Sequence, residues 1–414
     1  MIDPGSAASL DEPPLHGGDV PGKVLILRWG GSAYDSLGGL LELTGRELAA
    51  DGFEPRLFVV DGQDWPNRLG AEVARGGYAF ALTMSGIGTD FRMPDGRLLW
   101  EAVQVPMFNW CCDHPCYFPT RHVIRSSYLL HGYVFPDHAD YNIRHLNPNG
   151  AAYAVHMGIP PRGIFGDVPL PLASRNGRIV FSKSGKNTNE IEEAWRRRMP
   201  LVRDILFEAA ETLFHRNTAD FLPGLQQAAE RRGLHLSGNS DLAIALLLDL
   251  DAYVRFRRAE MLVRTLLRYP VDVYGRGWDH IGWDGASARL LGPAPWADML
   301  RQLPQYLGCL SMNPLVDLST HDRVFFALAA GVPASSDSNE FSRSHMPEME
   351  PYAFAFTRER IEQAIDALLS DPQAALERSE ATWQTLSERF SMRYSARQIV
   401  QFIGLRSGNV RTAN

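Results

Sequence analysis

Short apolar segments alternate with helical patterns over the first 110 residues, and this alternation restricts the possible folds more than any other feature. Lys23–Trp29 has an unbroken apolar centre, which is typical of a parallel strand covered on both faces. Further strands are predicted at Arg56–Val60, Tyr78–Met84 and Val105–Trp110, with helices at about Leu37–Asp51 and Leu98–Val103. The pattern predicts a doubly wound α/β domain whose ligands lie beyond the carboxyl ends of the strands.

A second alternation of the same kind follows a long helical stretch. Strands are predicted at Arg178–Phe181, Val271–Tyr274, Leu290–Gly292 and Leu307–Met312, and helices at Trp296–Leu303, Arg358–Leu369 and Pro372–Arg389. Between them, residues 190–267 carry Leu and Ala at three- and four-residue spacing. We therefore expect a helical insertion over residues 188–268, which either packs structurally or recognises an acceptor.

The length of 414 residues exceeds a usual single domain, so two domains are expected. We predict a disordered lead over residues 1–21, a first doubly wound domain over 22–172, and a second over 173–395. The proline-rich run from Pro160 to Pro171 favours a linker between the two domains. A helix and tail over residues 396–414 are expected to cross back to the first domain.

Composition excludes several classes of protein. A hydrophobic content of 45% and a charged content of 21% are typical of a globular chain. The net charge of −7 opposes nucleic-acid binding, which normally needs a basic excess. No apolar run is long enough for a transmembrane helix, and the N-terminus lacks the pattern of a signal peptide. Four cysteines make no disulfide framework, so the predicted location is the cytoplasm.

The stretch from Asn313 to Asn339 predicts a polar loop, a buried helix and a short strand. Ser319, Thr320 and Asp322 are good helix-capping types, and Arg323–Ala330 is apolar almost all round. Gly331 ends this helix, and the strand is expected to finish at residues 337–339. The amino end of such a helix offers free N–H groups and a positive dipole end, which suit a diphosphate. The alternative is an ordinary buried helix of an α/β domain.

The run from Ser319 to Phe325, followed by Ala-Gly-Val-Pro and Ser-Asp-Ser-Asn, resembles the donor-site segment of bacterial glycosyltransferases related to the spore-maturation protein CgeB. Two positions depart from the pattern of these families. Asp322 replaces a Glu, and Phe326 occupies the position of a Glu that binds the donor ribose in the wider families. The resemblance implies an α/β fold of the GT-B type, with two Rossmann-like domains facing a cleft.

The same resemblance implies a set of donor-binding residues for a nucleotide-diphospho-sugar. They are Lys183, Lys186, Gly275, Trp278, Asn313, Ser319, Thr320, His321, Asp322 and Arg323. Lys183 and Lys186 lie in a loop after a predicted strand, for which a solvated turn is the alternative. Gly275 and Trp278 belong to a Gly-x-Gly-Trp segment that resembles one in this glycosyltransferase group. The turn Trp29, Gly30 and Gly31 is implied to face the cleft.

The segment from Asn109 to Cys116 carries the most reactive side chains of the N-terminal half. Asp113 and His114 adjoin a predicted strand end, where a carboxylate and an imidazole are able to hold or move a proton. Asp113 is our first candidate for a general base and His114 the second. A metal site is disfavoured because the spacing of the Cys and His residues is unsuitable. A capping Asp beside a packed His is the remaining alternative.

These features together predict a glycosyltransferase that moves a sugar, in the manner of a hexosyltransferase, from a nucleotide-sugar to a protein, lipid or glycan. The nucleotide-sugar is a substrate, no separate cofactor or metal ion is expected, and nucleic acid is not an expected partner. Two alternatives remain: a nucleotide-sugar epimerase of the same fold, and a non-catalytic sugar- or protein-binding module. The sequence leaves open the sugar, the nucleotide, the acceptor, the stereochemical course and the oligomeric state.

Overall fold

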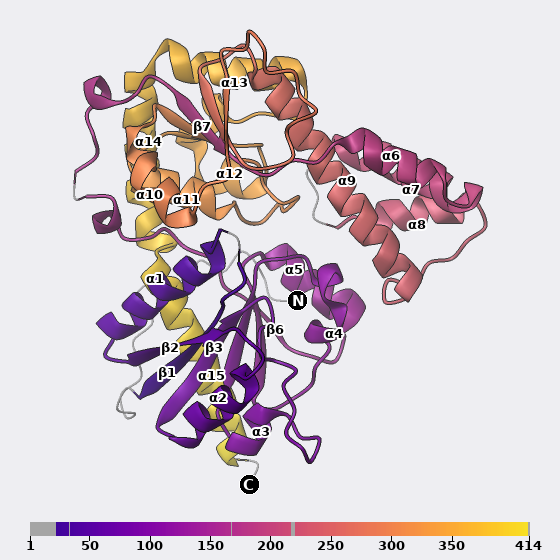
Figure 1. Cartoon of the computed structure of the whole chain (residues 1–414), viewed down its shortest axis with the longest axis vertical. Helices are drawn as coiled ribbons and strands as arrows, with labels where there is room; N and C mark the ends of the chain where they lie inside the picture. Colours follow the sequence, from indigo (N-terminus) through magenta and orange to yellow (C-terminus); the bar gives the residue numbers. More distant parts are fainter. Residues whose placement is uncertain (1–21, 33, 167, 217–219, 413–414) are drawn as a thin grey trace.

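Two parallel β-sheets, each covered by helices, form two domains that face each other (Figure 1). The computed structural model describes residues 22–412 except for residues 33, 167 and 217–219, so the predicted disordered lead, residues 1–21, lies outside the described residues. No helix within these ranges is long and apolar enough to cross a membrane.

The N-terminal domain is built on a six-stranded sheet with the order β2-β1-β3-β4-β5-β6. Its strands are β1 (Lys23–Trp29), β2 (Glu54–Val60), β3 (Tyr78–Met84), β4 (Met107–Cys111), β5 (Leu129–Tyr133) and β6 (Ala152–Ala154). Its helices are α1 (Ser36–Ala50), α2 (Trp65–Ala74), α3 (Leu99–Val103), α4 (Pro119–His122) and α5 (Pro136–Tyr141). All pairings in this sheet are parallel, as the buried apolar strand centres predicted.

The C-terminal domain is built on a five-stranded parallel sheet with the order β11-β10-β7-β8-β9. Its strands are β7 (Ile179–Ser182), β8 (Val271–Tyr274), β9 (Arg289–Gly292), β10 (Gly308–Leu310) and β11 (Ala334–Ser335). Its helices after the long insertion are α10 (Trp296–Gln302), α11 (Asp322–Ala329), α12 (Glu340–His345), α13 (Arg358–Ser370) and α14 (Pro372–Arg389). Helix α11 is buried, as its apolar residues predicted.

The predicted strand that ends at residues 337–339 is shorter in the structure. Strand β11 stops at Ser335, and Asp337 forms only an isolated bridge with Phe354. Asn339 instead caps α12, because its side chain accepts a hydrogen bond from the Ser342 N–H. Capping by an Asx side chain favours the start of a helix over continuation of the strand.

The long helical stretch between β7 and β8 forms a projecting helical arm, residues 188–266 (Figure 1). It consists of α6 (Thr188–Arg196), α7 (Pro200–Phe214), α8 (Leu222–Glu230) and α9 (Asp241–Leu266). The helices of the arm pack around an apolar cluster that is separate from the cores of the two sheets. This cluster also includes Cys116 and Tyr141 of the N-terminal domain. The arm therefore touches the opposite domain as well as the one from which it arises.

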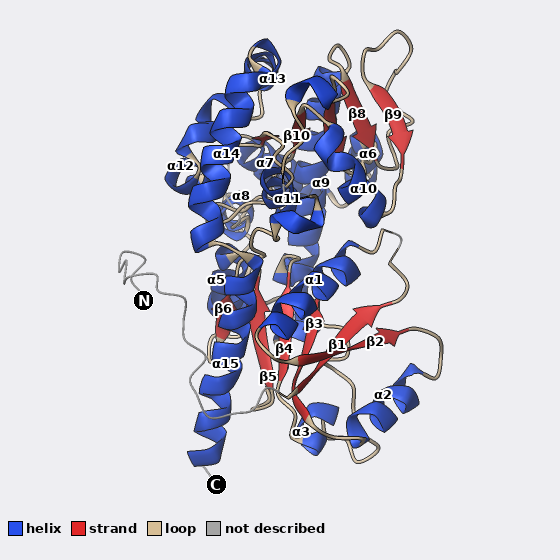
Figure 2. Ribbon diagram, turned by 90° about the vertical axis from the view of Figure 1, so that its left-hand side faces the viewer, coloured by secondary structure: helices blue, strands red, loops and turns tan. Residues whose placement is uncertain are grey.

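The last helix, α15 (Met392–Thr412), leaves the C-terminal domain and lies against α1 of the N-terminal domain (Figure 2). It begins four residues before Ala396, the predicted start, because the Ser391 hydroxyl accepts a hydrogen bond from the Tyr394 N–H and caps the helix there. Arg393 and Arg397 both donate hydrogen bonds to Asp51 at the end of α1. These ion pairs attach the last helix to the first domain.

We expect Asp51→Asn to lower the stability of the fold at pH 7. The Asp51 side chain is 4% exposed. Burial opposes its charge, yet the hydrogen bonds from Arg397 and Arg393 hold its pKa below the usual value. Removing the charge should cost about 1–3 kcal/mol of unfolding free energy. Because the pKa is depressed in the folded state, this stability exists above the ordinary Asp pKa and is lost as the pH falls through the depressed value.

Urea unfolding of both proteins at pH 7 and in the most acidic buffer that keeps them folded measures this effect. Glu388→Gln, on the exposed side of α14, is the control. A stability difference that does not shrink with acidity would contradict an ionic role for Asp51.

Candidate functional site

A cavity of about 330 Å³ lies between the two domains, at the carboxyl ends of both sheets. The N-terminal domain contributes residues from α1, from the end of β4 and from α5. The C-terminal domain contributes residues from the ends of β7 and β8, from α10 and from the start of α11, while α9 of the arm supplies one more side. Parallel α/β sheets bind ligands at this edge, so the cavity lies where the sequence predicted a site.

Among the described residues, three lysine or arginine side chains line this cavity. Lys183 follows β7, Arg323 lies in the first turn of α11, and Arg255 comes from α9. Burial and the nearby guanidinium groups of Arg255 and Arg323 lower the pKa of Lys183 well below its usual value. The three cations repel one another, although the chain as a whole has a net charge of −7. Such a cluster is expected where the ligand is an anion.

The amino end of α11 opens into the cavity, but its cap differs from the predicted one. His321 holds the N-cap position, rather than Ser319, Thr320 or Asp322. The Arg323 N–H lies 2.9 Å from Asp322 Oδ1 and 3.4 Å from His321 Nδ1, so the carboxylate is the better acceptor. His321 Nδ1 also contacts Asp322 Oδ1. A proton on Nδ1 satisfies this contact and leaves the Nε2 lone pair free.

His321 thereby orients Arg323. Burial, with help from the Arg323 guanidinium, lowers the pKa of His321 to about 4, so its ring is neutral at pH 7. Its Nε2 atom lies 3.0 Å from Arg323 Nη1 and accepts a hydrogen bond from it. Burial opposes the charge of Asp322, yet His321 and Arg323 lower its pKa to about 2, so the carboxylate stays ionised. The result is a fixed guanidinium at the positive end of a helix.

Three other predicted donor-binding residues lie behind the cavity wall, where they support α11. Asn313 Oδ1 accepts hydrogen bonds from Thr320 Oγ1 at 3.1 Å and from the His321 N–H at 3.0 Å. Ser319 Oγ lies 2.9 Å from His156 Nδ1 of the N-terminal domain. Asn313, Ser319 and Thr320 are all buried and are absent from the cavity lining. Their hydrogen bonds fix the loop that leads into the site.

The predicted pair Gly275 and Trp278 shapes the loop that presents Lys183. Gly275 lines the cavity at a φ of 142°, and a Cβ atom there would lie 2.2 Å from the carbonyl oxygen of Lys183. Trp278 is buried beneath Gly185 and donates a hydrogen bond from Nε1 to the Lys183 carbonyl at 2.8 Å. Lys186, further along the same loop, is exposed and does not line the cavity.

The predicted cleft turn lies at the end of β1 but does not line the cavity. Trp29 is 49% exposed, and Gly30 and Gly31 are exposed beside it. The residues that follow reach the site instead. Tyr34 lines the cavity, its hydroxyl lies 3.1 Å from Ser184 Oγ, and its carbonyl accepts a hydrogen bond from the Trp296 N–H at 3.0 Å. This loop therefore joins the two domains at one end of the cavity.

Asp113 and His114 line the cavity from the N-terminal domain. Burial raises the pKa of Asp113, although Arg255 opposes this effect, and the Ser85 hydroxyl donates a hydrogen bond to its Oδ2 at 3.3 Å. A carboxylate with a raised pKa suits a general base. Burial lowers the pKa of His114 to about 4. Its Nδ1 accepts a hydrogen bond from the Cys116 N–H at 3.2 Å, so Nε2 carries the proton.

These contacts separate the roles of the two neighbours. His114 Nε2 is buried and has no hydrogen-bond partner among the described residues. A neutral imidazole whose Nδ1 accepts a hydrogen bond and whose Nε2 carries the proton has no free lone pair with which to act as a base. Asp113 is thus the better candidate for the base. No group of three or more His, Cys, Asp and Glu residues in the described ranges is arranged to hold a metal ion.

Arg255 is the site residue that the sequence interpretation missed. Its Nη1 donates a hydrogen bond to Asp251 Oδ2 at 3.2 Å, and the Tyr117 hydroxyl of the N-terminal domain donates to the same oxygen. Asp251 is 2% exposed. The sequence signal for this pair was weak, because α9 carries six other charged residues and an Asp and an Arg four residues apart are common on a solvated helix face.

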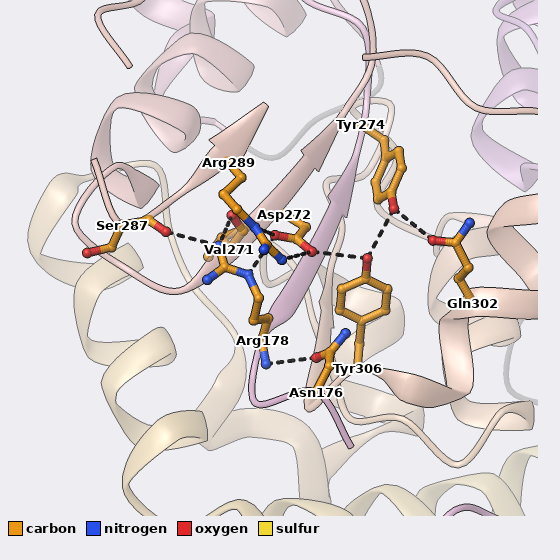
Figure 3. A network of polar contacts seen from close by, with 9 residues as sticks. All are labelled: Asn176, Arg178, Val271, Asp272, Tyr274, Ser287, Arg289, Gln302 and Tyr306. Atoms are coloured by element: carbon orange, nitrogen blue, oxygen red, sulfur yellow. Dashed lines mark hydrogen bonds and ion pairs between the residues drawn. The ribbon is translucent and has the colours of Figure 1, made fainter. Parts of the chain in front are cut away.

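Tyr274 lines the cavity and belongs to a hydrogen-bonded network, which Figure 3 shows. The Tyr274 hydroxyl donates to Gln302 Oε1 at 2.8 Å and lies 3.2 Å from the Tyr306 hydroxyl. Tyr306 in turn donates to the buried carboxylate of Asp272 at 3.2 Å. Arg178 and Arg289 also donate to this carboxylate, as Figure 3 shows. Since the Tyr274 hydroxyl is already satisfied, it contributes shape rather than ligand recognition.

Asp337 lies behind the donor-side loop, and we expect it to make stability depend on pH. It is 2% exposed, and its Oδ1 accepts a hydrogen bond from the Asn313 N–H at 2.7 Å. Burial raises its pKa from 3.8 to about 6. Folding therefore favours the protonated acid, and the contribution to stability is lost as the pH rises from the unfolded value through about 6.

Asp337→Asn should remove this pH dependence. The difference in unfolding free energy between the variant and the parent should increase by up to about 3 kcal/mol as the pH rises from 4 to 7. Any constant offset from the new amide cancels in this comparison. Urea titrations at several pH values measure it, and parallel pH profiles for the two proteins would contradict the role of Asp337.

Comparisons with known proteins agree with this architecture. Residues 257–401, which include α10, α11 and the last helices, match the family model described as Glycosyl transferase-like. An alpha-glucosyltransferase in complex with UDP and a mismatched 13-mer DNA superimposes with a TM-score of 0.52 and 9% identity, covering 92% of this chain and 100% of that chain. Anabaena Alr3699/HepE in complex with UDP-glucose gives a TM-score of 0.54 and 10% identity, covering 92% and 99%.

No curated protein matches the sequence significantly. At such low identity the structural matches establish the fold alone. The predicted fold is confirmed: the chain consists of two Rossmann-like domains in the GT-B arrangement of glycosyltransferases, and its C-terminal part carries a match to the Glycosyl transferase-like family.

Proposed function

We propose that this protein is a glycosyltransferase that moves a sugar from a nucleotide-diphospho-sugar to a protein, lipid or glycan acceptor. The proposal rests on one observation, which is the set of residues that line the interdomain cavity. Lys183, Arg255 and Arg323 lie there with the amino end of α11, and Asp113 lines the same cavity from the other domain. An anion-binding side and a carboxylate base are the two elements that sugar transfer needs.

In this proposal the donor diphosphate binds Arg323 and the N–H groups at the start of α11, with Lys183 beside it. The leaving nucleotide gains negative charge in the transition state, so fixed cations lower the barrier. Protein cations supply the neutralisation that a metal ion gives in other enzymes, and we therefore propose metal-independent transfer of a hexose. A nearer relation to the CgeB-like group is part of the proposal and rests on the resemblance of the run from Ser319 to Phe325.

On the acceptor side, Asp113 removes the proton from the attacking group in an inverting reaction. We give His114 no proton-transfer role, because its Nδ1 accepts a hydrogen bond from the Cys116 N–H and its Nε2 is buried. The mismatched DNA bound to the similar alpha-glucosyltransferase does not extend to this chain as a partner, since a net charge of −7 opposes it. The four free cysteines support a location in the cytoplasm.

A panel of nucleotide-sugars in a thermal-shift assay tests donor binding. A true donor at about 100 times its dissociation constant should add roughly 2.7 kcal/mol of stability. Release of free sugar and nucleotide without acceptor would favour transfer over the rival epimerase reaction. The absence of stabilisation by every nucleotide-sugar would favour the rival binding module, for which the Phe326 substitution is the best support.

Arg255 is expected to contribute to donor affinity through the helical arm. Arg255→Met should raise the donor KM by about 10- to 100-fold, because one charge-assisted hydrogen bond is worth about 1.5–3 kcal/mol. Arg257→Met, two residues away and outside the cavity lining, is the matched control. Steady-state kinetics at varied donor concentration give the answer. Equal effects of the two substitutions would mean that the arm acts only through its packing.

A further inference from the structure

A group of apolar side chains lines the cavity and adjoins the anion-binding side. It is formed by Leu37 and Leu40 of α1, Trp296, Met299 and Leu300 of α10, and Phe326 of α11, and we call these six residues the apolar lobe. Phe326 lies three residues after Arg323 on the same helix, so the two side chains share a helix face. A group attached to a diphosphate at Arg323 therefore reaches the lobe directly.

The aromatic side chains of the lobe are held in place before any ligand enters. The rings of Trp296 and Phe326 meet edge to face, with centroids 5.5 Å apart and planes at 73°. Trp296 also packs on the backbone of α1, where a Cβ atom at Gly39 would lie 2.2 Å from the indole ring, and it still lines the cavity. An indole fixed in this way offers a surface for a flat ring.

The six side chains of the lobe carry no carboxylate, amide or hydroxyl group that could bind the hydroxyl groups of a ribose. Within the described part of the chain, no Glu, Asn or Gln lines the cavity, and its two carboxylates are Asp113 and Asp322. Asp322 is engaged by His321 and by the Arg323 N–H. Asp113 accepts a hydrogen bond from the Ser85 hydroxyl at the carboxyl end of the N-terminal sheet. Dinucleotide-binding sites typically use a carboxylate for the ribose hydroxyls.

We propose that the apolar lobe binds the nucleoside of the donor through its base, by stacking and apolar contact, with no strong recognition of the ribose hydroxyls. This inference rests on the proposed function. It means that the donor site accepts a 2′-deoxyribonucleotide nearly as well as the ribonucleotide. The diphosphate then fixes the position of the donor, and the lobe adds affinity through the area of the base.

Isothermal titration of the full chain with UDP, 2′-deoxy-UDP and inorganic pyrophosphate tests this inference. UDP and 2′-deoxy-UDP should bind within about fivefold of each other, because only neutral hydrogen bonds differ. Both should bind at least about fivefold more tightly than pyrophosphate, since base stacking on an aromatic ring is lost with the base. A larger preference for UDP over its deoxy form, or pyrophosphate binding as tight as that of UDP, overturns the inference.

Substitution of Trp296 locates the contact. Trp296→Ala should weaken UDP and 2′-deoxy-UDP alike, by about fivefold or more, and leave pyrophosphate unchanged. Trp296→Phe should restore most of the affinity, which also shows that the variant chain is folded. Trp65→Ala, in α2 outside the cavity, is the control. A loss below fivefold for Trp296→Ala contradicts base stacking. Failure of the parent protein to bind any nucleotide overturns the proposed function as well, an outcome distinct from binding with ribose selectivity.

Discussion

Asp113→Asn is expected to lower kcat by about 10²- to 10⁴-fold while changing the donor KM little. The carboxylate faces the cavity from the N-terminal domain, and burial raises its pKa toward the range in which a base works well. Asparagine keeps the size and the contact with Ser85 but takes up no proton. Steady-state kinetics with a donor and acceptor identified by the binding panel measure the effect.

The pH dependence provides a second measurement for Asp113. A base acts when it is deprotonated, so kcat/KM of the parent should fall as the pH drops through the raised pKa of Asp113. The variant should lack this acidic limb. Asp90→Asn, an exposed carboxylate in the loop after β3, is the matched control. If Asp113→Asn retained a third of the parent kcat, another group would have to be the base.

Arg323→Ala is expected to lower kcat/KM by about 10²- to 10³-fold. The guanidinium lies at the amino end of α11, where it adds to the helix dipole and is oriented by the lone pair of His321 Nε2. The loss should appear in kcat as well as in donor affinity, because charge on the leaving diphosphate increases in the transition state. Arg323→Lys should have a kcat/KM between those of the parent and Arg323→Ala, since an ammonium group keeps the charge but loses the fixed, planar set of donors.

Arg343→Ala is the matched control for Arg323, because Arg343 is an exposed arginine that pairs with Glu340 on α12. Donor titration and steady-state kinetics of the three Arg323 and Arg343 variants separate binding from catalysis. Unchanged donor affinity in Arg323→Ala would contradict a diphosphate site at α11 and remove the main support for the proposed function.

Much of the fold followed from local patterns. Lys23–Trp29, Tyr78–Met84, Val271–Tyr274 and Pro372–Arg389 have the predicted bounds, because a continuous apolar run or a regular helical spacing is determined within the segment itself. The amino end of the helix after His321 was also identified, since capping residues lie next to the helix that they start. Boundaries moved where a single side chain, such as that of Ser391 or Asn339, made a cap.

The composition of the site was less predictable. Asn313, Ser319 and Thr320 were grouped with the donor contacts, yet they lie in the second layer and hold α11 in place. Arg255 was missed because it lies in the middle of the helical arm, outside every motif that was singled out, and reaches the cavity only when the arm packs against the N-terminal domain. The sequence ranked Asp113 before His114 as the base but gave the protonation state of neither, since protonation depends on burial and on partners such as the Cys116 N–H.

By itself the sequence determined two parallel α/β units, a helical stretch between strands of the second, and a helix whose amino end suits an anion. These features depend on apolar side chains that recur every three to four residues in a helix or every two residues in a strand. Each segment contains this period in its own sequence. Only the tertiary structure decided which charges share one cavity, how the lobe of Trp296 and Phe326 adjoins them, and which neighbouring group is protonated. Those properties come from distances and burial between residues far apart in the chain, and no local pattern contains them.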